Sequence, residues 1–255
     1  MRKKSHAMTL LSRFFGKNKV RDPVSLEYLV TDMHSHLIPG LDDGARDMET
    51  ALALIQRMKE LGYRKLIATP HIMSDIYRNT HKSISDGMRS LQHAAAAAGI
   101  NIQLEAAAEY MVDDGLARLL ETQDLMTFGD RFVLVELPYY SAPDHLNSLL
   151  FDLQVAKYKP ILAHPERYGY WHQQFNRLEE LKERGVYFQL NIISLSGYYS
   201  SPTKKMAEKL IEAGMIEFLG SDLHNQQSLA LLEKTLTQPA LEKVMISGKL
   251  LNHLI

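Results

Sequence analysis

The sequence predicts an α/β fold in which short parallel strands alternate with amphipathic helices. Three observations predict it. Seven short apolar runs suit buried strands, helical patterns lie between them, and a Gly repeatedly ends a helical stretch just before the next run. Such alternation is typical of a parallel sheet with right-handed crossovers. Seven units suit a closed barrel, although the pattern alone also permits an open doubly wound sheet.

The expected strands are rich in aliphatic, β-branched and aromatic residues. They cover residues 28–33, 65–69, 102–107, 132–137, 160–163, 186–191 and 216–220. The helix expected between the first two strands has one apolar stripe, made of Ala51, Leu54, Ile55, Met58 and Leu61. The glycines that follow helical stretches are Gly62, Gly99, Gly185 and Gly214.

The composition excludes several functional classes. The net charge of the 255 residues is -1, which gives no field for nucleic acid, and we expect no nucleic-acid partner. The absence of Cys excludes disulfides, thiolate metal sites and phosphatases that use a Cys nucleophile. It is compatible with a reducing compartment, and we expect a cytoplasmic protein.

Residues 1–27 form a basic extension that we expect to be mobile. Its short apolar patch, Leu10-Leu11 and Phe14-Phe15, lacks the length and cleavage site of a signal peptide. Weak peripheral contact with a membrane, or docking to a partner, is the alternative role for this segment. No run is long enough to span a membrane, and residues 28–255 are expected to form one domain.

Metal-ligating residue types lie at or near the C-terminal ends of six of the seven expected strands. The sixth strand, which ends at Asn191, is the exception. The remaining strand ends and one loop provide nine candidate ligands: His34, His36, Asp43, His71, Glu109, Glu136, His164, Asp222 and His224. His34 and His36 lie on one face of an extended segment because side chains alternate there. The C-terminal ends of parallel strands meet at one face, where barrel enzymes place their sites.

These side chains predict a metal centre with more than one ion. Unpaired acids and imidazoles crowded at a buried face would cost several kcal/mol, and cations offset that cost. Nine ligands are too many for one ion, so two or three ions that share a bridging carboxylate are expected. Mixed imidazole and carboxylate ligands suit zinc, manganese or iron. Such ions lower the pKa of bound water and clamp a phosphoryl group.

The same residues resemble the PHP (polymerase and histidinol phosphatase) superfamily. The motifs are His34-Ser-His36, Asp42-Asp43-Gly44, Thr69-Pro70-His71, Glu109, Glu136, the segment from His164 to Tyr168, and Ser221-Asp222-Leu223-His224. More closely, the segment from Asp32 to Ala45 resembles bacterial tyrosine phosphatases encoded in capsule and exopolysaccharide operons. The resemblance implies a distorted (β/α)7 TIM-like barrel, the PHP fold, with three ions that are usually manganese.

The resemblance also implies roles for individual residues. One ion would bind His34, His36, Glu109 and Asp222, a second would bind Glu109, Glu136 and His164, and a third would bind Asp43, His71 and His224. Glu109 would bridge, and a metal-bridging hydroxide would attack phosphorus. Arg167 matches the family's phosphate-binding Arg, and its alternative role is a salt bridge with Glu166 or another acid. The implied substrate is the phosphotyrosine tail of a bacterial tyrosine autokinase.

One departure from the family pattern concerns phosphate binding. Family members usually have a second Arg shortly after the Asp-x-His motif, but residues 225–230 contain no basic residue. Either another cation replaces that Arg or phosphate binds more weakly. A histidinol-phosphate or other small-molecule phosphatase therefore remains an alternative. So does a non-catalytic, metal-holding protein that docks the kinase. A nuclease is a weaker alternative, because no basic, aromatic-rich groove is visible.

Overall fold

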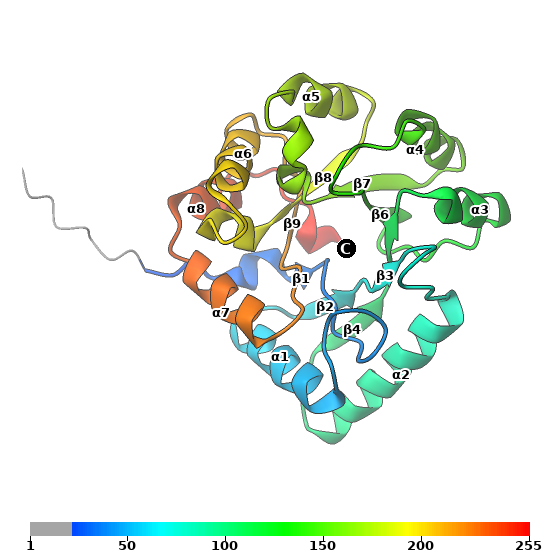
Figure 1. Ribbon diagram of the computed structural model, residues 1–255. Coiled ribbons are helices and arrows are strands. Elements are labelled where there is room, and N and C mark those ends of the chain that lie inside the picture. The colour runs from blue at the N-terminus through cyan, green and yellow to red at the C-terminus, as the bar shows by residue number, and fades with distance from the viewer. Residues whose placement is uncertain (1–21) are drawn as a thin grey trace, which may run out of the picture.

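Seven parallel strand positions surround a common axis in the computed structural model, which describes residues 22–255 (Figure 1). The strands are β1 Thr31–Asp32, β2 Lys65–Ala68 continued by β3 His71–Ile72, β4 Gln103–Ala106 continued by β5 Glu109–Met111, β6 Phe132–Glu136, β7 Lys159–Ala163, β8 Tyr187–Asn191 and β9 Phe218–Gly220. The strand order is β1-β2-β4 in one sheet and β3-β5-β6-β7-β8-β9 in the other, with every pair parallel.

The first and last strand positions pair just beyond their C-terminal ends and close the barrel. Ser35 and Leu223 form a parallel bridge. Asp222 N donates to His34 O, and His36 N donates to Leu223 O, both at 2.9 Å. The predicted α/β barrel of seven units is therefore confirmed, and the open doubly wound sheet is excluded.

The start of the first predicted strand is wrong. Residues 26–29 form the 3-10 helix η1 (Leu26–Leu29), and β1 covers only Thr31–Asp32. The Ser25 side chain accepts a hydrogen bond from Glu27 N, which caps η1 at its N-terminus. Val30 then turns the chain with a φ of 64°, so an extended conformation begins only at Thr31.

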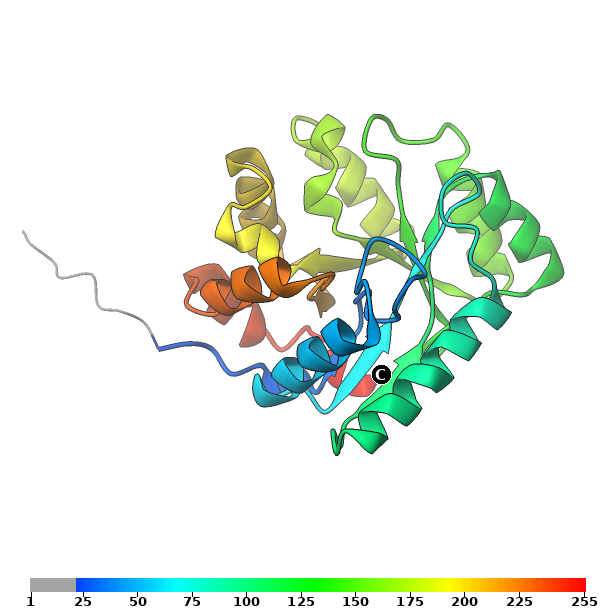
Figure 2. The same cartoon turned by 60° about the horizontal axis from the view of Figure 1, so that its bottom comes forward.

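The helices cover the outside of the strands, as the turned view in Figure 2 shows. They are α1 Met48–Glu60, α2 His81–Ala97, α3 Asp114–Thr122, α4 Leu146–Val155, α5 Phe175–Glu183, α6 Ser201–Glu212, α7 Gln226–Thr235 and α8 Pro239–Met245. Shorter 3-10 helices are η2 Pro165–Arg167, η3 Gly169–Trp171, η4 Ile192–Ser196 and η5 Asn252–Leu254. Four of the five residues in the predicted α1 stripe are buried, and Leu61 is partly exposed. Gly99 and Gly185 adopt the expected left-handed conformation, with φ of 72° and 81°.

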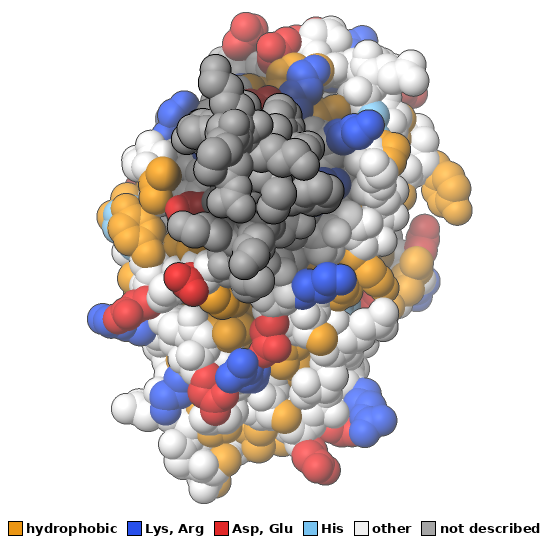
Figure 3. Space-filling view, turned by 90° about the vertical axis from the view of Figure 1, so that its left-hand side faces the viewer, with side chains coloured by type: hydrophobic (Ala, Val, Ile, Leu, Met, Phe, Trp, Pro, Cys, Tyr) orange, Lys and Arg blue, Asp and Glu red, His pale blue; other side chains and the backbone are white. Residues whose placement is uncertain are grey.

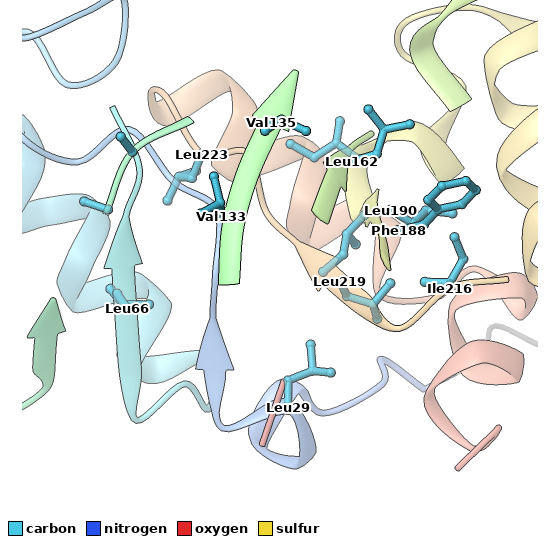
Figure 4. Close-up of a cluster of buried hydrophobic side chains, with 14 of the residues drawn as sticks. Leu29, Leu66, Val133, Val135, Leu162, Phe188, Leu190, Ile216, Leu219 and Leu223 are labelled. Atoms are coloured by element: carbon cyan, nitrogen blue, oxygen red, sulfur yellow. The ribbon is translucent and has the colours of Figure 1, made fainter. Parts of the chain in front are cut away.

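The hydrophobic core has two layers. The larger layer fills the space between strands and helices, where Figure 4 shows Phe188, Leu190 and Leu219 grouped with their neighbours. The smaller layer includes Met33, Ile67, Ala107, Leu134, Ile161 and Phe218, which come from six different strand positions. Because those residues alternate with the helix-facing ones, they point inward and fill the barrel. The barrel interior below the C-terminal mouth is therefore largely apolar.

The N-terminal extension is described only in part. Residues 1–21 lie outside the described residues, so the mobility and membrane contact expected of this segment stay predictions. In residues 22–27, Val24 N donates to Leu236 O and Leu26 is fully buried. No helix within residues 22–255 is long and apolar enough to cross a membrane. Basic and acidic side chains are interspersed on the face of the molecule shown in Figure 3.

Asn252 ties the two strands at the barrel seam, and its removal should destabilise the fold. Its buried side chain donates to Thr31 O and Leu219 O and accepts from Leu219 N. Asn252→Ala should lower the free energy of unfolding by about 3 kcal/mol, because buried backbone groups lose their partners. Urea denaturation measures this change. Asn101→Ala, at an exposed position, is the matched control. Equal unfolding midpoints for the two variants would contradict the role of Asn252.

Candidate metal centre

All nine predicted ligands meet at the C-terminal mouth of the barrel. Their ligand atoms form four overlapping groups, and within each group the atoms lie within 4.8 Å of one another. The groups are His36, Asp43, His71 and His224; His34, His36 and Asp222; His34, Glu109 and His164; and His71, Glu109 and Glu136. The shared members join these groups into one continuous cluster of imidazoles and carboxylates.

His34 and His36 present the same ring nitrogen to the centre. Their Nε2 atoms are 3.3 Å apart. On the far side of each ring, His34 Nδ1 donates to Gln189 Oε1 at 2.8 Å and His36 Nδ1 donates to Asp42 Oδ2 at 2.7 Å. A hydrogen bond at Nδ1 fixes both the tautomer and the orientation of the ring. Gln189 and Asp42 therefore leave the two Nε2 lone pairs free to bind a cation.

Glu109 lies between four imidazoles and is fully buried. Its Oε2 is 3.2 Å from His34 Nε2, 3.5 Å from His36 Nε2 and 3.1 Å from His71 Nδ1. Its Oε1 is 3.1 Å from His164 Nε2. Burial alone would raise the pKa of Glu109, but His34 and His71 hold that pKa well below its usual range. An ionised carboxylate in this position is suited to bridge two cations.

Glu136, His71, Asp43 and His224 extend the cluster toward the mouth. Glu136 Oε1 is 2.7 Å from His71 Nδ1. Asp43 Oδ1 lies 3.6 Å from His71 Nε2 and 3.5 Å from His224 Nε2. Burial and the nearby Glu109 raise the pKa of Glu136, whereas the His224 hydrogen bond lowers the pKa of Asp43. Glu136, the more deeply buried of these two carboxylates, is thus harder to ionise than Asp43 without a cation beside it.

Asp222 connects the cluster to Arg167. Its Oδ1 is 3.4 Å from His34 Nε2 and 3.5 Å from His36 Nε2. Its Oδ2 accepts hydrogen bonds from Arg167 Nη1 at 2.8 Å and from Asn191 Nδ2 at 2.7 Å. Arg167 therefore does pair with an acid, but the acid is Asp222 rather than Glu166. Because Asp222 is a candidate ligand, this pairing keeps the guanidinium beside the cluster.

Two of the candidate ligands have a left-handed backbone conformation. The φ angle is 35° at His164 and 51° at Asp222, and neither residue is a glycine. Such conformations cost about 1–3 kcal/mol each and are concentrated at functional sites. The strain turns both side chains from the end of a strand into the cluster.

Several buried atoms of the cluster form no well-aligned hydrogen bond within residues 22–255, although Glu136 Oε1 and His71 Nδ1 lie only 2.7 Å apart. They are Glu109 Oε2, Glu136 Oε1, His71 Nδ1 and His164 Nδ1. Orphaned buried polar atoms are rare and require an explanation such as an ion. Because all four are good ligands for a borderline-hard cation, the residues present fit a centre of divalent ions.

A cavity of about 250 Å³ lies over the cluster, and three of its lining residues are tyrosines. The Tyr77 ring stacks at 5.5 Å on His71, and the Tyr139 ring stacks at 6.1 Å on His164. The Arg167 guanidinium lies 4.9 Å from the Tyr139 ring and 4.3 Å from the Tyr199 ring, so it is held between them. The cavity thus has a charged floor and aromatic walls.

The tyrosines and Gln189 were not among the predicted site residues. Gln189 could have been found from strand alternation, because it lies two residues before Asn191 on a buried strand and so shares its face. The tyrosines follow their strands at different distances and belong to no spaced motif. Nothing in the sequence separates them from the other nine tyrosines.

Comparisons with known proteins identify relatives over most of the chain. The family model described as "Capsular polysaccharide synthesis, CpsB/CapC" matches residues 30–238. Tyrosine-protein phosphatase YwqE of Bacillus subtilis is 29% identical over 212 residues, which cover 80% of this chain and 84% of that protein. Tyrosine-protein phosphatase CpsB of Streptococcus pneumoniae is 26% identical over 204 residues, covering 77% of this chain and 84% of that protein.

A solved structure is similar to the barrel as well. It comes from work on YwqE of Bacillus subtilis and CpsB of Streptococcus pneumoniae, described as unique metal-dependent tyrosine phosphatases. It superposes with a TM-score of 0.72 and 28% identity, over 82% of this chain and 89% of that chain. The similarity of the fold therefore agrees with the similarity of the sequences.

The protonated imidazoles of the centre make the metal-free protein sensitive to pH. Burial would lower the pKa of His34, His71 and His224, but the neighbouring carboxylates outweigh it and raise these values to about 9, 10 and 9. A pKa raised by folding adds stability that is complete below the unfolded value of about 6.5 and is lost as pH rises through the folded value. In chelator, the free energy of unfolding should therefore fall by at least about 2 kcal/mol between pH 7 and pH 9.

Chemical denaturation across that pH range measures the loss. His71→Gln should make the decline shallower, because one of the titrating groups is removed. His93→Gln, at an exposed position on α2, is the matched control and should leave the slope as it is in the parent protein. A flat profile for the parent protein in chelator would contradict the electrostatic account.

Proposed function

The chain belongs to the CpsB/CapC family of capsular polysaccharide synthesis, and we propose that it is a metal-dependent protein-tyrosine phosphatase. The observation that supports this most directly is the placement of Arg167 and three tyrosines over a cluster of buried ligand atoms, four of which form no well-aligned hydrogen bond within residues 22–255. Relatives named tyrosine-protein phosphatases that match three quarters or more of the chain support the same activity. The proposed reaction is hydrolysis of a phosphomonoester.

The nine residues of the cluster hold the ions in this proposal. The expected number of divalent ions is three. Manganese is the favoured metal, with zinc or iron as alternatives, because imidazole nitrogens and carboxylate oxygens suit manganese, zinc and iron alike. Bound ions supply Lewis-acid activation of water and neutralise charge on the phosphoryl group. Gln189 and Asp42 orient the first two imidazoles, and Glu109 connects the deep and outer parts of the centre.

Arg167 binds the phosphoryl oxygens. Among residues 22–255, the Arg167 guanidinium has one hydrogen bond, from Nη1 to Asp222, so its other N–H groups are available to a substrate. The rings of Tyr139 and Tyr199 hold the guanidinium plane, which reduces the rotamer entropy that is lost when phosphate binds. The charge of Arg167 persists at any physiological pH, because Asp222 raises its pKa even further despite burial.

The aromatic walls favour an aryl phosphate. A phenyl ring that enters above the charged floor contacts aromatic surface, whereas a phosphoserine side chain has no ring to pack there. Phenol leaves readily, since its pKa is about 10, and needs little help from a general acid. The chain has no Cys, which excludes a cysteinyl-phosphate intermediate, and in this proposal water attacks phosphorus directly while the phenol oxygen leaves.

The proposed partner is a bacterial tyrosine autokinase, whose phosphotyrosine tail is the substrate. The family's connection to capsular polysaccharide synthesis supports this assignment, as do relatives named tyrosine-protein phosphatases. No chemistry of the centre distinguishes one kinase from another.

Metal removal should abolish the activity. Chelation should reduce hydrolysis of a phosphotyrosyl peptide by at least about 100-fold, and manganese should restore it, because the ions supply the electrostatic stabilisation. Metal analysis and a phosphate-release assay on the same sample measure both effects. A variant with His34→Ala and His36→Ala should stay inactive with manganese, and His93→Ala is the control.

Two outcomes would support the other assignments. Faster turnover of histidinol phosphate than of phosphotyrosyl peptide would identify a small-molecule phosphatase. A manganese-loaded protein that hydrolyses no aryl phosphate would be a regulator that docks its partner without turnover.

Replacing Arg167 tests its role with phosphate. Arg167→Lys keeps the charge but loses the planar fork, so kcat/KM for a phosphotyrosyl peptide should fall about 10- to 100-fold. Inhibition by inorganic phosphate should weaken in parallel, which steady-state kinetics measures. Arg177→Lys, at an exposed arginine on α5, is the matched control. An unchanged inhibition constant for phosphate in Arg167→Lys would place the phosphoryl group elsewhere.

A further inference from the structure

Each tyrosine of the cavity wall has a large apolar neighbour in sequence that is exposed. Ile76 precedes Tyr77, Tyr140 follows Tyr139, and Tyr198 precedes Tyr199. The exposed fractions of Ile76, Tyr140 and Tyr198 are 71%, 98% and 51%. We call these three residues the mouth rim.

The mouth rim surrounds the cavity rather than lying on one side of it. Ile76 follows β3, Tyr140 follows β6, and Tyr198 follows β8 through η4. These are the second, fourth and sixth of the seven strand positions, so the three loops alternate around the barrel mouth (Figure 1). Of the nine large hydrophobic residues exposed in residues 22–255, these three and Tyr139 belong to this one face. Exposed apolar side chains gathered around a site mark an interaction surface.

We propose that the mouth rim binds the polypeptide on both sides of the phosphotyrosine, and that it recognises apolar or aromatic flanking residues. This inference rests on the proposed phosphatase function, because the cavity has to hold the phosphorylated side chain while the rim contacts the main chain beside it. The rim then makes a polypeptide, rather than a small phosphomonoester, the preferred substrate.

The dimensions and chemistry of the mouth favour that occupant. A small phosphomonoester fits within the cavity of about 250 Å³, where Ile76 is the one rim residue that lines it, and has no further atoms to reach Tyr140 or Tyr198. A polypeptide that inserts one side chain must leave the mouth in two directions and therefore crosses the loops. Tyrosine offers a rigid apolar ring with a polar end, which packs on side chains and hydrogen-bonds to an extended backbone.

A binding experiment with two non-hydrolysable ligands tests the rim. One ligand is a peptide in which phosphonomethyl-phenylalanine lies between leucine and phenylalanine residues, and the other is phenylphosphonate. Both are titrated into manganese-loaded protein, and the ratio of their Kd values is compared between variants. In the rim variant with Ile76→Ser, Tyr140→Ser and Tyr198→Ser, the peptide Kd divided by the phenylphosphonate Kd should rise at least about tenfold, because truncated apolar and aromatic anchors lose binding energy.

A matched control carries Phe151→Ser, Val155→Ser and Ile246→Ser, which replace exposed apolar residues that do not line the cavity. Its ratio should equal that of the parent protein, and melting temperatures verify that all three proteins are folded. An unchanged ratio in the rim variant, or an equal rise in the control, overturns the inference.

The same proteins separate this inference from the proposed function. If the parent protein hydrolyses phosphotyrosyl peptide and the rim variant keeps the parental ratio, only the rim assignment fails. If the parent protein hydrolyses no aryl phosphate but the rim variant shows the tenfold change, the phosphatase assignment fails and the docking surface stands.

Discussion

The burial of the Glu109 carboxylate among four imidazoles is the constraint on which the rest of the structure depends. Such a charge is tolerable in a barrel interior only when opposite charge surrounds it, and that charge has to come from several strands at once. The parallel barrel provides this, because all its strands end at the same mouth. The apolar layer of Met33, Ile67 and Phe218 beneath the centre then excludes water from below.

Much of this architecture could be predicted from the sequence. Alternating strands and helices indicated the barrel, and the nine candidate ligands were visible because each follows a strand or a nearby turn. Two features were harder to predict. The 3-10 helix before β1 depends on a Ser25 cap and on Val30 with positive φ, which apolar residues such as Leu26 and Leu29 do not reveal. The aromatic cavity wall depends on loop conformations, which no periodicity encodes.

The residues behind the ligands explain why the cluster is ordered rather than merely crowded. Gln189 and Asp42 each accept a hydrogen bond from one imidazole, so the nitrogen that faces the centre is defined before any ion arrives. The unusual backbone angles at His164 and Asp222 serve the same purpose at two other strand ends. Preorganisation of this kind lowers the reorganisation energy that charge development requires during catalysis.

The seam between the first and last strands has a consequence for how the protein matures. Ser221 N donates to Asp32 Oδ1 across 189 positions of sequence; Ser221 immediately precedes Asp222, and Asp32 lies two residues before His34. Contacts of such high sequence separation form late, because the entropy of closing a long loop must be overcome first. In a nascent or partly folded chain, His34 and His36 are therefore apart from Asp222. Binding of metal by all three residues has to wait until the first and last strands close the barrel.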